Sequence, residues 1–244
     1  MLNLAVLQLC PSLGQVEKNL SYVLERIERV ERGSVVALPE MWQCGFDYEN
    51  LKDHAKATER VLEALRQVSR EKELTLIGSY PLQTERGIHN SAIIVDRGEV
   101  VGVRHKIKLF PLYEEQRYFL PGSENPIFEL PGFRLGILLC FELRFPLLSW
   151  GLRRAELLVV PSLWGAKRRE HLITLSRARA IENQSFLMLA NGWGRVGEEE
   201  YAGSSAIYGP WGEVLAFSEK GDSLLQVRVD LKEVERVRNS VPVA

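Results

Sequence analysis

The chain has 244 residues, of which 45% are hydrophobic and 26% are charged, and its formal net charge is -1. This composition is ordinary for a globular protein that buries a sizeable core. A net charge this close to zero argues against the electrostatic attraction by which proteins bind nucleic acid or anionic membranes, so we expect neither partner.

The N-terminus and the cysteines bear on the compartment. The apolar run over residues 2–9 has no basic leader and no small-residue cleavage site, and it is too short to span a bilayer. Cys10, Cys44 and Cys140 cannot all pair within one chain, and no CxxC spacing occurs. We therefore expect reduced thiols, no structural zinc site and a cytoplasmic location.

The first third of the chain alternates strands and helices. Residues 2–9 and the valine-rich run 34–39 predict buried strands. Apolar residues recur at helical spacing over 16–30 and again over 58–72, and residues 74–80 predict a third strand. This order is typical of βαβ units with neighbouring strands.

The rest of the chain predicts hairpins as well as βα units. Two strands, 91–96 and 100–106, flank a glycine-containing turn. A helix is expected over 166–183, and the later strands are expected at 134–140, 157–162, 185–191, 204–208, 214–217 and 224–229. No repeat or linker interrupts the pattern, so we expect a single domain over residues 1–244. Two central mixed sheets with helices on both outer faces account for it. The predicted fold class is therefore α/β, a four-layer α-β-β-α sandwich.

The apolar run over residues 35–39 ends at Glu40. A carboxylate at the tip of a buried strand lies where desolvation can raise its pKa, which suits a general base. Taken alone, a glutamate at this point is more often the start of a loop.

The segment 101–110 carries His105, Lys106 and Lys108. Strand alternation predicts that the two lysines share one face and that the histidine lies on the other. A lysine directed at a buried site can stabilise an oxyanion. Taken alone, the pair is better explained as flanking an edge strand, where lysine discourages aggregation.

The run over residues 136–139 ends at Cys140, just before a turn into a helix. Such a turn exposes the side chain and leaves the following backbone N–H groups free for an oxyanion. A thiol with an ordinary pKa of about 8.5 needs a nearby base or cation to attack as a thiolate. Taken alone, a cysteine here is more often a small buried hydrophobe.

Together, the three strand ends supply a base, a cation and a thiol, which are the roles that acyl transfer through a thioester requires. With this set the chain resembles the carbon–nitrogen hydrolase (nitrilase) superfamily. Members carry a glutamate after a strand, a lysine in an R-K-x-H-L-F-like segment and a cysteine in a C-Y-D-x-R-F-P-like segment. The matching segments read L-P-E-M at 38–41, H-K-I-K-L-F at 105–110 and C-F-E-L-R-F-P at 140–146, and the likeness extends to 177–184 and 209–212.

The resemblance also implies a second site glutamate, a few residues before a Pro-Gly pair. Glu115 matches that position better than Glu114, although the two are adjacent. Lys106 is preferred to Lys108 because the family lysine precedes the Leu-Phe pair by three positions.

Several positions depart from the family pattern. Phe141 and Glu142 replace the common tyrosine and aspartate, while Lys108 and Ser204 stand where many relatives have histidine. None of these changes removes a catalytic role.

The resemblance implies cysteine-dependent hydrolysis of a small amide to acid and ammonia through a thioester. Cys140 would be the nucleophile, Glu40 the general base and Lys106 the oxyanion donor, with Glu115 positioning the substrate amine or tuning Glu40. No metal or organic cofactor is implied.

The F-E-L-R-F-P segment is similar to amidases of small dicarboxylate mono-amides, the omega-amidase-like branch. This branch implies a carboxylate-bearing substrate and assigns Phe141 and Trp164 to substrate binding, although Trp164 is equally well explained as packing. Lys108, Arg117 and the basic run 167–169 are the candidates for receiving the substrate carboxylate.

Other activities use the same residues. The alternatives to an amidase are an N-carbamoyl-amide hydrolase or a nitrilase, and, less favoured, a non-catalytic small-molecule-binding member. In relatives, helices comparable to 166–183 contribute to dimers, so we expect a homodimer or a larger homo-oligomer. The apolar stripe Leu172, Leu175, Ala178 and Ile181 is then either core or subunit interface.

Overall fold

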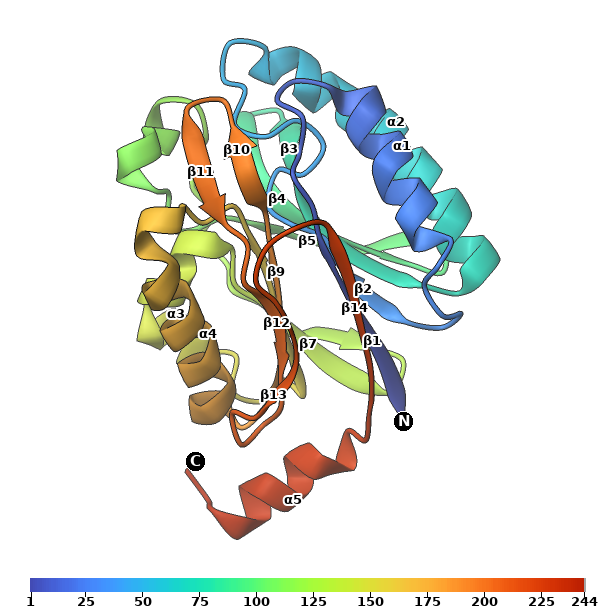
Figure 1. The fold of residues 1–244 in the computed structure, drawn as a ribbon, viewed down its shortest axis with the longest axis vertical. Coiled ribbons are helices and arrows are strands. Elements are labelled where there is room, and N and C mark those ends of the chain that lie inside the picture. The colour runs from blue at the N-terminus through green and yellow to red at the C-terminus, as the bar shows by residue number, and fades with distance from the viewer. Residues whose placement is uncertain (244) are drawn as a thin grey trace.

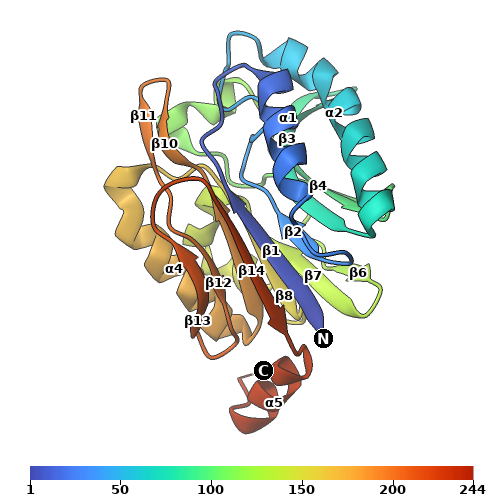
Figure 2. The same ribbon diagram turned by 45° about the vertical axis from the view of Figure 1, so that its right-hand side comes forward.

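The computed structural model describes residues 1–243. Two six-stranded mixed sheets pack face to face, and helices cover their outer faces, as Figures 1 and 2 show. The four-layer α-β-β-α sandwich predicted from the sequence is confirmed. No helix in the described part of the chain combines the length and the apolar character that crossing a bilayer demands.

The first sheet is built mainly from the N-terminal half. Its order is β14 (Ser223–Val229), β1 (Leu2–Gln8), β2 (Val35–Ala37), β3 (Thr75–Thr84), β4 (Gly87–Asp96) and β5 (Glu99–His105). β1, β2 and β3 are parallel to one another, and the remaining pairs are antiparallel. Helices α1 (Val16–Ile27) and α2 (Leu51–Lys72) cover its outer face (Figure 1).

The second sheet follows the same plan. Its order is β13 (Val214–Ser218), β12 (Ser205–Tyr208), β9 (Phe186–Asn191), β8 (Leu157–Ser162), β7 (Phe133–Ile137) and β6 (Phe128–Leu130). β7, β8 and β9 are parallel. Helices α3 (Pro146–Trp150) and α4 (Arg169–Asn183) lie outside it (Figure 1). A separate hairpin, β10 (Trp193–Val196) and β11 (Glu199–Ala202), projects beyond the sheet, and α5 (Lys232–Ser240) ends the chain's regular structure.

Burial explains why the central strands read as continuous apolar runs. Every residue of β8 is buried, because one face packs against the other sheet and the opposite face packs against helices. The helices bury only one face: in α1, Val16, Leu20, Val23 and Ile27 are buried at helical spacing.

Some element bounds differ from the sequence expectation. α2 begins at Leu51, whereas the sequence predicted a start at residue 58. The apolar pattern missed the first two turns because they are mostly polar and bury only Leu51, His54 and Ala55. The expected helix over 166–183 begins with a 3-10 turn, η4 (Ala166–Arg168), before α4. β6, the β10–β11 hairpin and α5 were not anticipated, and each is short.

The last three strands do not form successive hairpins within one sheet. β13 pairs with β12 in the second sheet, whereas β14 crosses to the first sheet and pairs with β1 over the register Leu2↔Val229 to Gln8↔Ser223. The first and last strands of the chain are therefore neighbours.

Candidate active site

Chain segments leaving four strands meet at one end of the sandwich. Glu40 follows β2, Lys106 follows β5, and Cys140 follows β7. Leu163 follows β8, and its backbone N–H donates to Glu40 Oε2 at 3.2 Å, which joins the ends of the two sheets. A crevice beyond the carboxyl ends of parallel strands is a common place for a ligand site in α/β proteins.

One lysine is held between two carboxylates. Lys106 Nζ donates to Glu40 Oε1 and to Glu115 Oε1, each at 2.7 Å. All three residues have no exposed surface. Burial alone would lower the pKa of Lys106, but the charges of Glu115 and Glu40 outweigh it and hold that pKa well above its ordinary value. Lys106 is therefore a fixed cation.

The two glutamates have different second partners. Glu40 accepts a hydrogen bond from Asn90 Nδ2 at 2.9 Å, while Glu115 Oε2 accepts one from the Phe110 backbone N–H at 2.9 Å. Burial, helped by the Glu40 charge and opposed by Lys106, raises the pKa of Glu115.

The structure distinguishes the neighbouring residues that the sequence left as alternatives. Glu115 lies in the site, whereas Glu114 is exposed and contacts Arg117 at 3.0 Å. Lys106 is buried, whereas the Lys108 side chain is exposed and lies 5.2 Å from the centroid of the Phe145 ring. The expectation that both lysines share a strand face is wrong, because β5 ends at His105 and alternation stops there.

Cys140 lies on a strained turn. Its φ angle is 46°, in the left-handed region that residues with a β-carbon rarely adopt, and it starts the 3-10 turn η3 (Cys140–Arg144). Burial is the main cause that raises the pKa of the Cys140 thiol, and the Glu40 charge adds to it, while Lys106 works in the opposite direction. These effects favour the uncharged thiol, so attack by the sulfur requires a base that accepts its proton.

Glu142 ties the lysine segment to this turn. Its carboxylate accepts hydrogen bonds from the backbone N–H groups of Leu139 and Ile107, each at 2.7 Å. It also pairs with Arg104 Nη1 at 2.6 Å, in an ion pair whose side chains are both fully buried. The sequence showed Glu142 only as a conservative replacement. Its position two residues after Cys140 was the available signal.

A second arginine holds the far end of the same turn. Arg179 in α4 is 4% exposed and donates to the Leu143 carbonyl from Nε at 3.0 Å and from Nη2 at 2.8 Å. It also pairs with Glu182 at 2.6 Å, the helix neighbour expected from the sequence. The helix pair alone would contribute little, but the carbonyl contacts connect α4 to η3.

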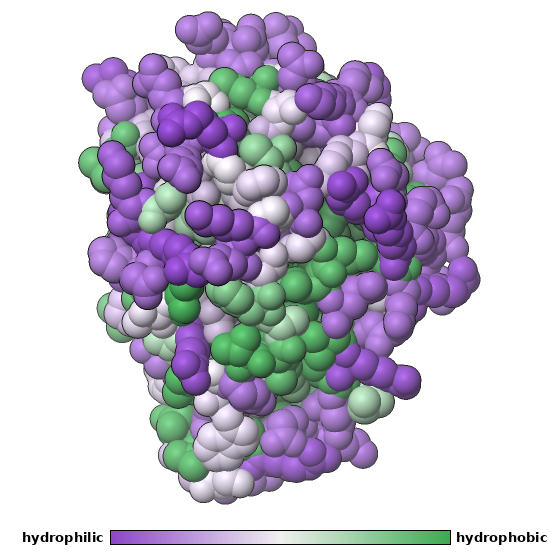
Figure 3. Space-filling view, in the orientation of Figure 1, coloured by the Kyte–Doolittle hydropathy of each residue, from purple (hydrophilic) through white to green (hydrophobic). Residues whose placement is uncertain are grey.

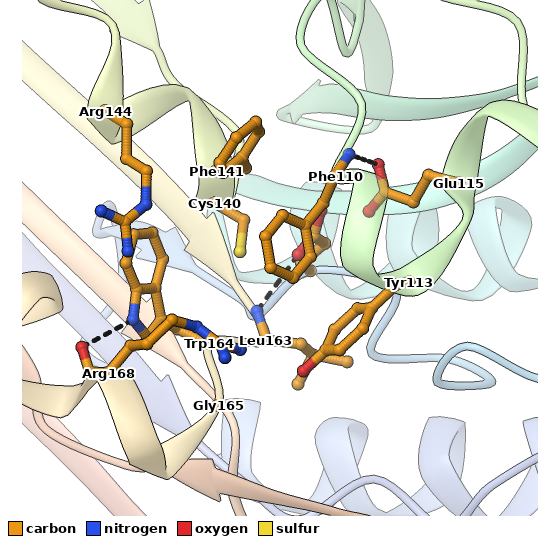
Figure 4. A pocket seen from close by; sticks show the side chains of 11 residues that line it. Phe110, Tyr113, Glu115, Cys140, Phe141, Arg144, Leu163, Trp164, Gly165 and Arg168 are labelled. Atoms are coloured by element: carbon orange, nitrogen blue, oxygen red, sulfur yellow. Dashed lines mark hydrogen bonds between the residues drawn. The ribbon is translucent and has the colours of Figure 1, made fainter.

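A narrow pocket opens beside Cys140 (Figure 4). Phe141 and Trp164, both predicted to bind substrate, line it. Its remaining lining comes from Glu40, Phe110, Tyr113, Glu115, Arg144, Leu163, Gly165 and Arg168.

The basic residues proposed to receive a substrate carboxylate differ in whether they line this pocket. Lys108 and Arg117 are exposed and do not line the pocket, and Lys167 is exposed as well. Arg168 does line it, together with Arg144, which sequence reasoning missed although it lies within the C-F-E-L-R-F-P segment.

Comparisons with known proteins find a matching family model and relatives of similar length. The model of the family described as carbon-nitrogen hydrolase matches residues 3–239. The 2-oxoglutaramate amidase of Bacillus subtilis is 32% identical over 98% of this chain and 95% of its own length. The omega-amidase YafV of Yersinia enterocolitica is 30% identical over 93% of this chain and 89% of its own length.

Solved structures share the fold. A CN-hydrolase superfamily protein from Xanthomonas campestris superposes with a TM-score of 0.93, at 24% identity, over 99% of this chain and 95% of that chain. Saccharomyces cerevisiae Nit3, a member of branch 10 of the nitrilase superfamily, gives a TM-score of 0.90 at 22% identity, over 99% and 94%. At these identities the likeness shows the fold alone.

Proposed function

The chain belongs to the carbon–nitrogen hydrolase family, and from that premise we propose that it hydrolyses a small, carboxylate-bearing amide to acid and ammonia through a thioester at Cys140. One observation carries the proposal. The buried ammonium of Lys106 bridges Glu40 and Glu115 at 2.7 Å each, beside a cysteine on a strained turn. That set contains a base, an oxyanion donor and a nucleophile in one pocket.

The first step is attack on the amide. The Glu40 carboxylate accepts the Cys140 proton as the sulfur attacks the carbonyl carbon. An ammonium has three N–H donors, and two of those on Lys106 are already used by Glu40 and Glu115. The third is available for the oxyanion, along with a backbone N–H just after Cys140, and such a donor contributes about 3 kcal/mol to lowering the barrier.

The second step breaks the carbon–nitrogen bond. Glu40 gives its proton to the leaving nitrogen, ammonia departs and an acyl thioester remains on Cys140. Glu40 then accepts a proton from water, which attacks the thioester, and returns it to the sulfur as the acid leaves. Glu115 holds Lys106 in place throughout, and its charge tunes the basicity of Glu40.

The relatives' names support an amide as substrate, since they are a 2-oxoglutaramate amidase and an omega-amidase. A carbamoyl amide and a nitrile could be attacked by the same residues. The substrates and products distinguish these reactions. A carbamoyl substrate yields carbon dioxide together with ammonia, and a nitrilase consumes a nitrile.

The test is ammonia release from a panel of mono-amides, carbamoyl amino acids and nitriles, with Cys140→Ala alongside. We expect release from carboxylate-bearing mono-amides by the parent alone. Added hydroxylamine should then divert the acyl group to a hydroxamate, which reports the thioester. Equal ammonia release by the parent and Cys140→Ala would contradict the mechanism, and release from nitriles or carbamoyl compounds alone would replace the substrate class.

A further inference from the structure

Ser162 is the last residue of β8, the strand beside the one that leads to Cys140. β7 and β8 are parallel, with Ile137 opposite Val159, and the pairing continues one residue further, where the Leu138 N–H donates to the Val159 carbonyl at 3.1 Å. In this register Cys140 is level with Ser162. The two residues are therefore neighbours at the same end of the second sheet.

The Ser162 side chain lies on the same side of the sheet as the Cys140 thiol. Side chains alternate along a strand, so Ser162 shares the face of Leu158 and Val160. Those two residues belong to the apolar cluster that contains Cys140 and packs between the second sheet and α4. Pairing and alternation together place the hydroxyl on the side of the thiol rather than on the side of the other sheet.

The Ser162 hydroxyl is buried without an ordinary partner. Ser162 has no exposed surface, and over residues 1–243 its Oγ pairs with no nitrogen or oxygen atom. Its backbone is well held, because the carbonyl accepts hydrogen bonds from the N–H groups of Gly192 at 3.1 Å and Glu40 at 3.4 Å. An unpaired buried hydroxyl costs stability, so its presence here calls for an explanation other than folding.

The Cys140 sulfur is the acceptor that this hydroxyl can reach. Burial raises the pKa of Cys140 and the Glu40 charge adds to it, whereas the Lys106 charge and a hydrogen bond from Ser162 lower it. The contact is not well aligned in the resting structure, but catalytic hydrogen bonds often tighten only as charge develops. A serine hydrogen rotates about its C–O bond, so it can turn towards the sulfur when the thiol proton leaves.

We propose that the Ser162 hydroxyl donates a hydrogen bond to the Cys140 sulfur whenever that sulfur becomes negatively charged, and so assists catalysis. This inference rests on the proposed function. During attack the thiol proton moves to Glu40, and the hydroxyl stabilises the sulfur left behind. When water opens the thioester, the carbon–sulfur bond breaks and the same hydroxyl stabilises the departing sulfur until Glu40 returns the proton. Ser162 neither gains nor loses a proton in either step.

This donor complements the lysine. Lys106 already donates to Glu40 and Glu115, and in the proposed mechanism its third N–H serves the carbonyl oxygen of the substrate. Ser162 does not line the pocket, so its hydroxyl approaches the sulfur from the protein interior and leaves the pocket side to the substrate. One donor thus stabilises charge on oxygen, and the other stabilises charge on sulfur.

The experiment measures alkylation of Cys140 by iodoacetamide across a range of pH. The Cys140 peptide is followed by mass spectrometry, because Cys10 and Cys44 are also free thiols. Ser162→Ala removes the donor without adding bulk, so the pKa of Cys140 should rise by about one pH unit. Below that pKa, alkylation should slow by about threefold to tenfold. In amide hydrolysis kcat should fall by about tenfold while KM changes little.

Ser185→Ala is the matched control. Ser185 is also fully buried, at the opposite end of the second sheet, but its Oγ donates to the Ala155 carbonyl at 2.7 Å. This variant should therefore unfold at a lower temperature and leave the alkylation of Cys140 unchanged. Ser162→Ala should lose no thermal stability, because the hydroxyl that it removes has no partner in the resting structure.

Alkylation also separates this inference from the proposed function, since it needs no amide turnover. Slower alkylation in Ser162→Ala, in a protein whose parent hydrolyses no amide, would support the Ser162 contact and overturn the proposed function. An alkylation profile identical to that of the parent would overturn the contact. A fall in kcat accompanied by an unchanged profile would overturn it too, because the hydroxyl would then act on something other than the sulfur.

Discussion

Neighbouring charges control the ionisation of the buried side chains in the pocket, and the Cys140 thiol is an example. Cys140 is buried between a cation, Lys106, and an anion, Glu40, with opposite effects on its ionisation. In the proposed mechanism the thiol is neutral at rest, and transfer of its proton to Glu40 creates the nucleophile. Reactivity is thus tied to one carboxylate rather than to a permanently ionised sulfur.

The first prediction concerns Glu40→Gln. This change removes a negative charge that raises the pKa of Cys140, so the pKa should fall and the thiolate fraction at a given pH should rise. The midpoint of the pH profile for alkylation by iodoacetamide should move to lower pH, while amide hydrolysis is lost with the base. An unmoved midpoint would show that the Glu40 charge does not control the thiol.

The second prediction concerns Glu142, which holds Leu139 and Ile107 and pairs with the buried Arg104. Glu142→Gln leaves a buried guanidinium without its anion, so we expect a loss of about 3–5 kcal/mol in the free energy of unfolding. We also expect kcat to fall while KM changes little, because the turn that aims Cys140 loosens.

A double variant checks this account. Arg104→Met combined with Glu142→Gln removes both charges and should recover part of the stability, measured by urea unfolding. Glu142→Asp keeps the carboxylate and should retain more kcat than Glu142→Gln. Additive losses in the double variant would mean that the two side chains are not coupled.

Among the elements, the central strands could be predicted and the peripheral pieces could not. The bounds of β8 match the prediction of 157–162 because a strand buried on both faces shows as an unbroken apolar run. α5 buries only Val234 and Val237, too few to form a recognisable stripe. The chemistry of the strand ends was visible in the sequence, and Arg168 was among the basic candidates. Arg144 was missed, because η3 and η4 meet only in the folded chain.

The third prediction concerns how α5 is attached. Arg238 Nη2 donates to the Arg153 carbonyl at 2.8 Å and to the Ala155 carbonyl at 2.7 Å. Arg238→Met should therefore lower the free energy of unfolding by about 1–3 kcal/mol, since two partly buried carbonyls lose a charged donor. Amide hydrolysis should be unaffected, because none of these residues lines the pocket.

Arg236 provides the matched control on the same helix. Its ion pairs with Glu233 and Asp230 are largely exposed, so Arg236→Met should change stability by less than about 1 kcal/mol. If thermal unfolding ranks the two variants equally, the Arg238 contacts do not hold the helix.

The surface of the whole molecule carries apolar side chains that a monomer leaves in water. Figure 3 shows an apolar area where Figure 1 places β13 and β14, on a face that is otherwise largely hydrophilic. On the other side of the second sheet, the α4 stripe runs from the fully buried Leu172 to Ile181, which is 48% exposed. Trp211 and Val214 are each 52% exposed.

The fourth prediction is that the chain forms a homodimer that buries Ile181 and Trp211. Light scattering should give a mass of about twice 27.8 kDa for the parent. Ile181→Arg should shift it to the monomer, because a charge placed in an apolar interface is costly. Val101→Arg, at a 46% exposed position on the edge strand β5, is the control and should remain dimeric. A monomeric parent would contradict the expected assembly.

The pairing of β14 with β1 has a consequence for how the protein is made on the ribosome. Leu2 in β1 pairs with Val229 in β14. The first strand therefore emerges early and keeps an unpaired edge until β14 has been synthesised. Contacts this distant in sequence form slowly, and an unpaired edge strand invites association with other chains. A nascent chain arrested before residue 223 should therefore hold all four candidate catalytic residues and still depend on chaperones, because β1 lacks the strand that pairs with its outer edge.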